Sequence, residues 1–365
     1  MSLAYRTRIA LVRAAQWGRQ IVTRTPERLP MVYLHIGRNK AGSTTLQDFF
    51  LANRDALETG GVRYVLFGHM KDSVAGVPGF GHQDELATFA RAHLDMAVLV
   101  SNEFMFGWPR EYTDGMVAGL KGLDVRVIAY IRPYDSWLCS SYAQDVRNGE
   151  SLRDFDTYFD WLRPRISAWP YLEAWGEGLG WDRIRVSSID GRRTTWDDLV
   201  PDCLAAVGLD PALGATVPPS NQAPHWTTIE LLRRLIDRNL EAAWDDAGWA
   251  IASPLRQVFE ECLAAHPALD PKVQYLTPAQ TKELVELYNR DIAEIGRRTG
   301  FAFSPQIVTD VPARPFLPAF DHVPSELRRE FAARVAAPDF ERTHPKAAAA
   351  ARFRLLSPFA DAGAG

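Results

Sequence analysis

A lysine, a glycine and a run of hydroxyl side chains lie close together near the start of the chain, and together they could hold an anion. They are Lys40, Gly42, Ser43, Thr44 and Thr45. A helix that begins in such a run leaves backbone N–H groups unpaired and directs the positive end of its dipole at one point. The lysine would add a full positive charge on the rim. The pattern therefore predicts a site for phosphate or a phosphate-like group.

The residues around this run have the order strand, turn, helix. Residues 31–36 are apolar and β-favouring, which predicts a short buried strand. Residues 37–42 contain the two glycines of a turn, and Leu46, Phe49 and Phe50 then recur at helical spacing. We therefore expect the hydroxyl run to form the first turn of a helix that follows a buried strand.

The loop departs from the usual nucleotide-binding loop at one position. Gly37 and Gly42 have the spacing of the two Walker A glycines, but Ser43 stands where that motif has its lysine. The lysine of this chain, Lys40, comes two residues before the second glycine instead. On the loop alone, a plain helix start with a hydroxyl run would be an equally good interpretation.

A second strand-to-helix junction carries an arginine and a serine. Residues 125–131 form a near-continuous apolar run, typical of a buried parallel strand, and Arg132 follows at its end. Ser140 comes eight residues later in an expected helix, and Tyr142 two residues beyond it. An arginine fork suits a phosphate dianion, and the serine would add a hydroxyl donor. Each residue alone would more often be an ordinary surface or helix-face residue.

The two junctions together resemble sulfotransferases that use PAPS (3′-phosphoadenosine 5′-phosphosulfate). Lys40, Ala41 and Gly42, followed by the hydroxyl residues 43–45, match the 5′-phosphosulfate loop of that family. Arg132, Ser140 and Tyr142 match its 3′-phosphate motif, with the spacing of the heparan-sulfate type. The resemblance is closest to bacterial sulfotransferases; it extends from Met31 to about Gly149 and, more weakly, to about Phe303.

The resemblance implies a role for each matching residue. Lys40 would stabilise the oxygen that bridges sulfate and phosphate, and the backbone amides of residues 42–45 would hold the 5′-phosphate. Arg132 and Ser140 would hold the 3′-phosphate. Because the lysine and the helix start supply positive charge, no metal is expected.

Sulfuryl transfer also needs a base that takes the proton of the acceptor, and three residues are candidates. Glu103 ends an expected buried strand over residues 97–103, and ligands in parallel sheets bind outside such carboxyl ends. His69 lies in the glycine-rich segment 68–81, and His82 directly follows that segment. As alternatives, Glu103 could simply start the next helix, and His82 could flank a helix N-terminus. We rank Glu103 first, His82 second and His69 third.

Composition fits an α/β enzyme. The chain has 365 residues, 47% hydrophobic and 24% charged, and its net charge of −4 gives no overall basic field for nucleic acid. Its three cysteines fit neither a disulfide framework nor a zinc site, which favours a reducing compartment. No apolar run is long enough to cross a membrane. We expect a P-loop-like three-layer α/β/α fold with a central parallel sheet, in a cytoplasmic protein.

Three regions are expected along the chain. Residues 31–310 would form the sulfotransferase domain, and residues 311–365 a proline- and alanine-rich extension with short helices. Residues 1–30 hold six arginines and one acid. We favour a helix packed on its own domain there; a peripheral membrane helix or a transit-like leader are the alternatives.

The function that these observations predict is sulfuryl transfer from PAPS to a hydroxyl or amine of a glycan, lipid or small-molecule acceptor, with release of PAP. A P-loop small-molecule kinase is the alternative enzyme; the serine at position 43 argues against it. A nucleotide-binding or membrane-peripheral protein without turnover is the alternative from another class.

Overall fold

The structure of the chain is a computed structural model. It describes residues 31–68, 72, 74–148, 151, 153–189, 197–215, 229, 233, 246–266, 275–307 and 325–351. The predictions for residues 1–30 and for His69 therefore lie outside the described residues.

A six-stranded sheet forms the centre of the chain, and all its strand pairs are parallel. The strand order across the sheet is β3-β2-β4-β1-β5-β6. The strands are β1 (Met31–His35), β2 (Val62–Phe67), β3 (Gly79–Phe80), β4 (Ala97–Ser101), β5 (Asp124–Ile131) and β6 (Ile184–Ser188). This arrangement confirms the predicted parallel sheet.

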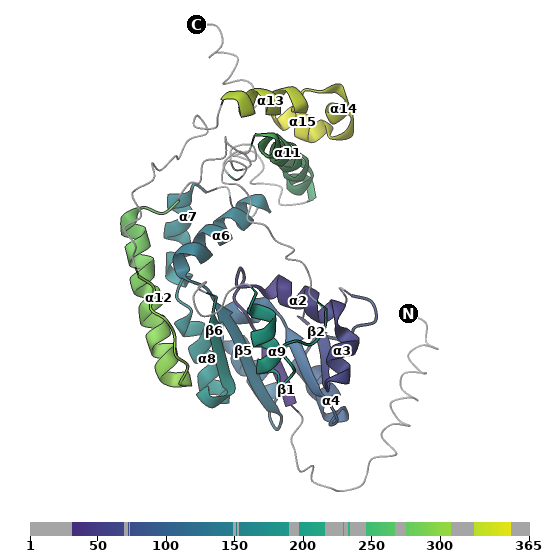
Figure 1. The fold of residues 1–365 in the computed structure, drawn as a ribbon, viewed down its shortest axis with the longest axis vertical. Helices are drawn as coiled ribbons and strands as arrows, with labels where there is room; N and C mark the ends of the chain where they lie inside the picture. Colours follow the sequence, from purple (N-terminus) through teal and green to yellow (C-terminus); the bar gives the residue numbers. More distant parts are fainter. Residues whose placement is uncertain are drawn as a thin grey trace.

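Helices cover both faces of the sheet, which gives three layers (Figure 1). One face packs against α2 (Ser43–Ala52), α3 (Arg54–Thr59) and α9 (Leu199–Ala206). The other packs against α4 (Gln83–Ala92), α5 (Arg110–Gly119), α8 (Trp169–Leu179) and α12 (Pro278–Thr299). The other elements between residues 31 and 189 that the structure describes are α6 (Tyr134–Arg147), α7 (Phe155–Leu162), and the 3₁₀ turns η2 (Glu103–Gly107), η3 (Arg163–Arg165) and η4 (Trp181–Arg183). The three-layer prediction is confirmed.

The central strand β1 shows why the sheet is buried on both faces. Val32 and Leu34 point into one hydrophobic cluster, and Tyr33 between them belongs to the other. Because side chains alternate along a strand, an unbroken apolar run suits a strand with helices on both sides.

One strand is shorter than predicted, and another follows a 3₁₀ turn that carries a stacked tryptophan. The strand expected over residues 97–103 ends at Ser101, because Asn102 turns the chain: its side chain accepts from the Phe104 N–H and donates to the Phe67 carbonyl. The strand β6 begins at Ile184. Before it, η4 brings the Trp181 ring into a stack on Trp169, with ring centroids 5.3 Å apart.

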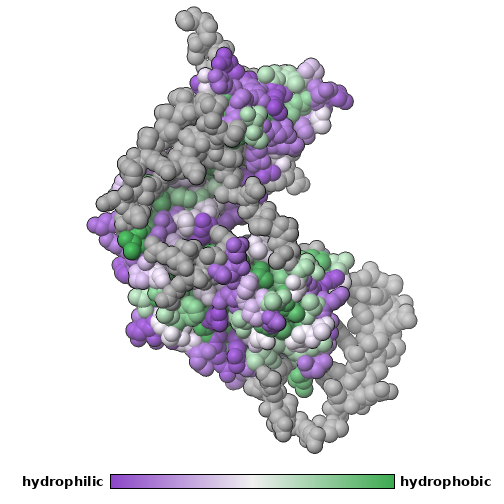
Figure 2. All heavy atoms as spheres, viewed as in Figure 1, coloured by the Kyte–Doolittle hydropathy of each residue, from purple (hydrophilic) through white to green (hydrophobic). Residues whose placement is uncertain are grey.

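The C-terminal helices pack around α11 (Asp246–Ala265). They are α13 (Ser325–Val335), α14 (Pro338–Thr343) and α15 (Pro345–Ala351), and both α13 and α15 contact α11. Figure 2 shows mainly hydrophilic side chains over α13 and a hollow between this helical group and the layer that carries α2. Short helices thus occur where they were expected, while the boundaries at residues 30 and 310 stay predictions. No helix in the described part is long and apolar enough to cross a bilayer.

Candidate functional site

The turn after β1 ends in a helix start that has no cap of its own. Gly42, at the N-cap of α2, has φ +90°, which an L side chain rarely adopts, and no side chain caps the helix. The first turn of α2 also contains no acidic residue. Ala41 is buried, Thr44 is exposed, and Thr45 is partly buried in that first turn. The helix N-terminus therefore keeps the positive potential that favours an anion.

Lys40 sits in this turn in an unusual backbone conformation. Its φ of +63° is the only positive φ of a non-glycine residue in the described part of the chain. Such conformations cost free energy and tend to occur where function constrains the backbone.

The ammonium of Lys40 lies among charges of both signs. Burial lowers its pKa; Arg147 and Arg132 lower it further, while Glu103 and Asp145 oppose the shift. It makes no hydrogen bond or ion pair with any described residue. Within the described part of the chain, the Lys40 ammonium is thus near charged groups but bonded to none of them. This is the situation expected of a cation that binds an anionic ligand.

Arg132 and Ser140 form the second part of the site. Arg132 directly follows β5 and is partly buried, and its Nη1 donates to Ser140 Oγ at 3.0 Å. Its Nε donates to Ser136 Oγ at 2.9 Å, and burial lowers its pKa. Ser136 was missed by the sequence reasoning, although a serine four residues after the arginine was a usable signal.

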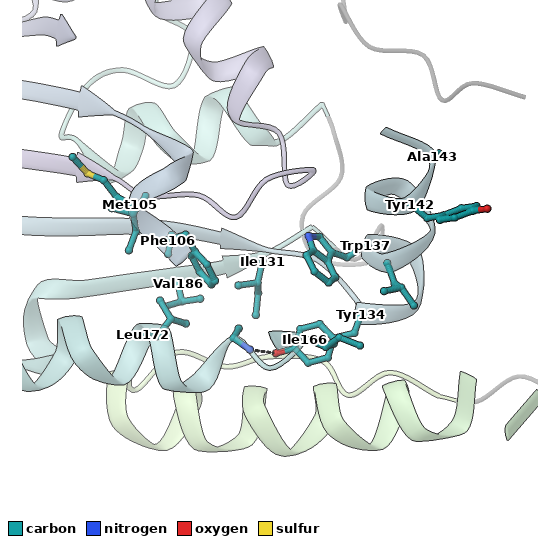
Figure 3. Close-up of a cluster of buried hydrophobic side chains, with 14 of the residues drawn as sticks. Met105, Phe106, Ile131, Tyr134, Trp137, Tyr142, Ala143, Ile166, Leu172 and Val186 are labelled. Atoms are coloured by element: carbon teal, nitrogen blue, oxygen red, sulfur yellow. Dashed lines mark hydrogen bonds between the residues drawn. The ribbon is translucent and has the colours of Figure 1, made fainter. Parts of the chain in front are cut away.

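Tyr142, the third residue of that motif, belongs to the core instead. Its ring meets Phe155, Tyr158 and Tyr275 edge-on, and its hydroxyl donates to the Arg153 carbonyl at 3.3 Å. Figure 3 shows Tyr142 on α6, pointing away from Trp137 and Tyr134. Its contacts here are those of a packing residue.

Strand pairing brings the two parts of the site together. β1 and β5 are neighbours in the sheet, and the Arg38 N–H donates to the Tyr130 carbonyl at 3.1 Å near the end of β5. The lysine turn and Arg132 therefore lie at the same carboxyl edge of the sheet.

Glu103 lies at this edge too, two residues after the end of β4. Ser43 Oγ donates to its carboxylate. The chain leaves β1 for α2 on one face and leaves β4 for α5 on the other, so these neighbouring strand ends form a topological switch point, where α/β proteins commonly bind ligands. Glu103 also begins η2, so the plainer interpretation, an acid at a helix start, describes its backbone.

His82 lies farther from the lysine turn. It is exposed at the N-cap of α4, just after the edge strand β3, and its N–H donates to the Glu85 carboxylate at 3.3 Å. β3 lies three strand spacings from β1, roughly 14 Å across the sheet. The structure brings Glu103, and not His82, into contact with the hydroxyl run.

A buried histidine beneath the turn was also missed by the sequence reasoning. His35 ends β1, and its Nδ1 lies 2.7 Å from Ser101 Oγ on β4. Burial lowers its pKa to about 3, so the imidazole is neutral at ordinary pH. A Cβ on Gly37 would lie 2.5 Å from its Nε2, which explains why a glycine begins the turn.

The described residues contain no cluster of three or more histidine, cysteine, aspartate or glutamate side chains that could bind a metal. The prediction that no metal is required stays a prediction.

Comparisons with known proteins give one distant likeness. No model of a protein family and no curated protein matches the chain. The crystal structure of a sulfotransferase from Alicyclobacillus acidocaldarius is similar at a TM-score of 0.34 and 14% identity, covering 57% of this chain and 97% of that one. A likeness of this size carries no argument about activity.

Proposed function

We propose that this chain is a sulfotransferase that transfers the sulfuryl group of PAPS to a hydroxyl or amine and releases PAP. One observation supports the proposal most. Arg132 directly follows β5 and donates to Ser140 of α6, and the neighbouring strand β1 leads to Lys40 and the uncapped start of α2. Two separate groups that suit phosphates thus lie on neighbouring strand ends, as a donor with phosphates at both ends of a nucleoside requires.

The residues present fit such a donor. The guanidinium of Arg132 and the hydroxyl of Ser140 offer the charge-assisted donors that a 3′-phosphate prefers. The first backbone amides of α2, over residues 42–45, would hold the 5′-phosphate. ATP lacks a 3′-phosphate, so it would leave Arg132 without its ligand.

Lys40 would act on the bond that breaks. In the proposed step, the acceptor oxygen or nitrogen forms a bond to sulfur while the bond from sulfur to the bridging oxygen breaks. That oxygen, left on the 5′-phosphate of PAP, gains negative charge, and the Lys40 ammonium stabilises it.

Glu103 would take the acceptor's proton. Its carboxylate lies at the switch point, in contact with Ser43 at the start of α2. A base here would be close to the sulfuryl group held at the same helix start. His82 and His69 stay the second and third candidates.

The proposal includes the cellular compartment of the protein and the class of its acceptor. The three cysteines are free, which agrees with the expected cytoplasmic compartment. The acceptor would be a glycan, a lipid or a small molecule, and peripheral membrane contact through residues 1–30 stays the alternative role of that segment.

A transfer assay tests the proposal. The protein is incubated with PAPS labelled in its sulfuryl group and with separate panels of glycans, phenols, lipids and amines, and labelled product and PAP are measured. We expect one panel to accept label and Lys40→Ala to abolish most of that transfer. Equal label transfer by the wild-type protein and Lys40→Ala would contradict the mechanism.

A further inference from the structure

A buried arginine lies in the lysine turn itself. The Arg38 side chain is only 3% exposed, and its guanidinium lies over the ring of Trp137, with its carbon 3.4 Å from the ring centroid. The rings of Tyr134 and Phe106 are 5.2 and 5.8 Å away, and Nη2 donates to the Arg165 carbonyl at 3.2 Å.

The charge of Arg38 is held mainly by aromatic faces, and the carboxylate of Asp291 adds an attraction that does not involve a direct ion pair. Arg38 forms no ion pair with a described carboxylate, and its buried Nη1 has no hydrogen-bond partner in the described part of the chain. Burial lowers its pKa to about 10, so it stays charged at neutral pH. Burying a cation in this way is costly, and a methionine of similar length would fill the space without that cost. The arginine therefore needs a reason beyond packing.

Trp137 connects this guanidinium to the residue before Lys40. Its indole N–H donates to the backbone carbonyl of Asn39 at 3.0 Å and lies 3.2 Å from Asn39 Oδ1. On the other side of the turn, the Arg38 N–H donates to Tyr130 of β5. Residues 38 and 39 are thus fixed from two directions, just before the left-handed backbone of Lys40.

Trp137 also belongs to the helix that carries the second part of the site. It lies on α6 three residues before Ser140, and neighbours at this spacing share one face of a helix. Figure 3 shows Trp137, Tyr134 and Phe106 grouped beside the end of β5. The stack of Arg38 on Trp137 therefore joins the lysine turn to the Arg132–Ser140 helix.

We propose that Arg38 is a positioning residue that, through Trp137 and Asn39, sets the place of Lys40 relative to the Arg132–Ser140 pair. This inference rests on the proposed function. A flat guanidinium can stack on the indole and donate to a carbonyl at the same time, whereas lysine offers only a point charge and methionine neither.

Two ligands separate this role from simple packing. Adenosine 3′-phosphate reaches only the Arg132 side of the site, whereas PAP also carries the 5′-phosphate. Calorimetry of Arg38→Met should show about tenfold weaker PAP binding and unchanged binding of adenosine 3′-phosphate, with Arg38→Lys in between. Arg126→Met, at an exposed arginine toward the other end of β5, is the control and should bind both ligands like the wild type.

The transfer rate gives a second, independent readout. If Arg38 acts through Lys40, Arg38→Met should lower transfer about tenfold in the wild-type background and less than twofold in Lys40→Ala. Equal weakening of both ligands by Arg38→Met, unchanged binding of both, or an additive loss in the double variant would overturn the positioning role. A wild-type protein that binds neither PAP nor adenosine 3′-phosphate would overturn the proposed function itself.

Discussion

The guanidinium of Arg132 donates to the hydroxyl of Ser140 at 3.0 Å, although Ser140 comes eight positions later in the chain. The proline after Arg132 ends the strand, and α6 then carries Ser140 back over the strand end. The end of β5 and the first two turns of α6 thus hold a cation and a hydroxyl side by side. Both groups can donate to one phosphate.

Ser140→Ala should weaken PAP binding about tenfold, because one donor to the 3′-phosphate is lost and Arg132 loses a partner that orients it. Ser141→Ala is a matched control on the same helix, since the buried Ser141 hydroxyl has no partner among the described residues. Calorimetry with PAP measures both. Similar binding by the two variants would remove Ser140 from the site.

Lys40→Ala should lower the transfer rate about 10² to 10³-fold, since removal of one donor to a developing negative charge typically costs that much. PAP affinity should fall less, because the lysine matters most as the bond to sulfur breaks. Lys121→Ala, at an exposed lysine after α5, should leave both quantities unchanged. A fall in affinity as large as the fall in rate would make Lys40 a binding residue only.

Glu103→Gln should bind PAP normally and lose transfer about 10² to 10⁴-fold, because an amide can still accept from Ser43 but cannot take a proton. His82→Ala, which removes the imidazole at the far edge of the sheet, is the comparison and should keep near-normal transfer. Near-normal transfer by Glu103→Gln together with lost transfer by His82→Ala would assign the base to His82.

The buried imidazole of His35 should make the stability of the fold depend on pH. Its pKa is about 3 in the folded chain and near 6.5 in the unfolded chain. Below pH 6.5 the unfolded state therefore binds a proton at His35 that the folded state does not bind. The His35 contribution to the free energy of unfolding is therefore complete above pH 6.5 and is lost as the pH falls toward 3. Between pH 7.5 and 5 the loss should be about 2 kcal/mol.

Urea unfolding at these two pH values measures this effect, with His35→Gln as the comparison. The variant keeps a hydrogen-bonding side chain near Ser101 but has no group that titrates, so it should lose about 2 kcal/mol less than the wild type over this range. An identical pH dependence for both proteins would show that His35 does not carry the effect.

Much of the site's scaffold could be predicted from local sequence. Met31, Ser43 and Ile131 mark strand and helix ends that the structure reproduces, because apolar runs and a hydroxyl-rich helix start are local signals. The order of the strands is not a local signal, because β1 pairs with β4 and β5 and not with β2, the next strand along the chain.

Other contacts lie beyond the reach of sequence patterns because they join distant segments. Trp137 and Asn39 are 98 residues apart, and Asp291 accepts hydrogen bonds from Tyr134 and from the Ala168 N–H across more than 120 residues. Only the fold brings these groups together. The buried charge of Arg38 was hidden for the same reason, since an arginine in a glycine turn is usually expected at the surface.

Thermal unfolding with nucleotide ligands tests the central claim most directly. With PAP at about 100 times its dissociation constant, the account predicts a gain of about 2.7 kcal/mol in the free energy of unfolding, and a smaller gain with ATP, which has no 3′-phosphate for Arg132. A clear shift with ATP and Mg²⁺, together with no shift with PAP, would contradict the assignment as a sulfotransferase and favour a kinase.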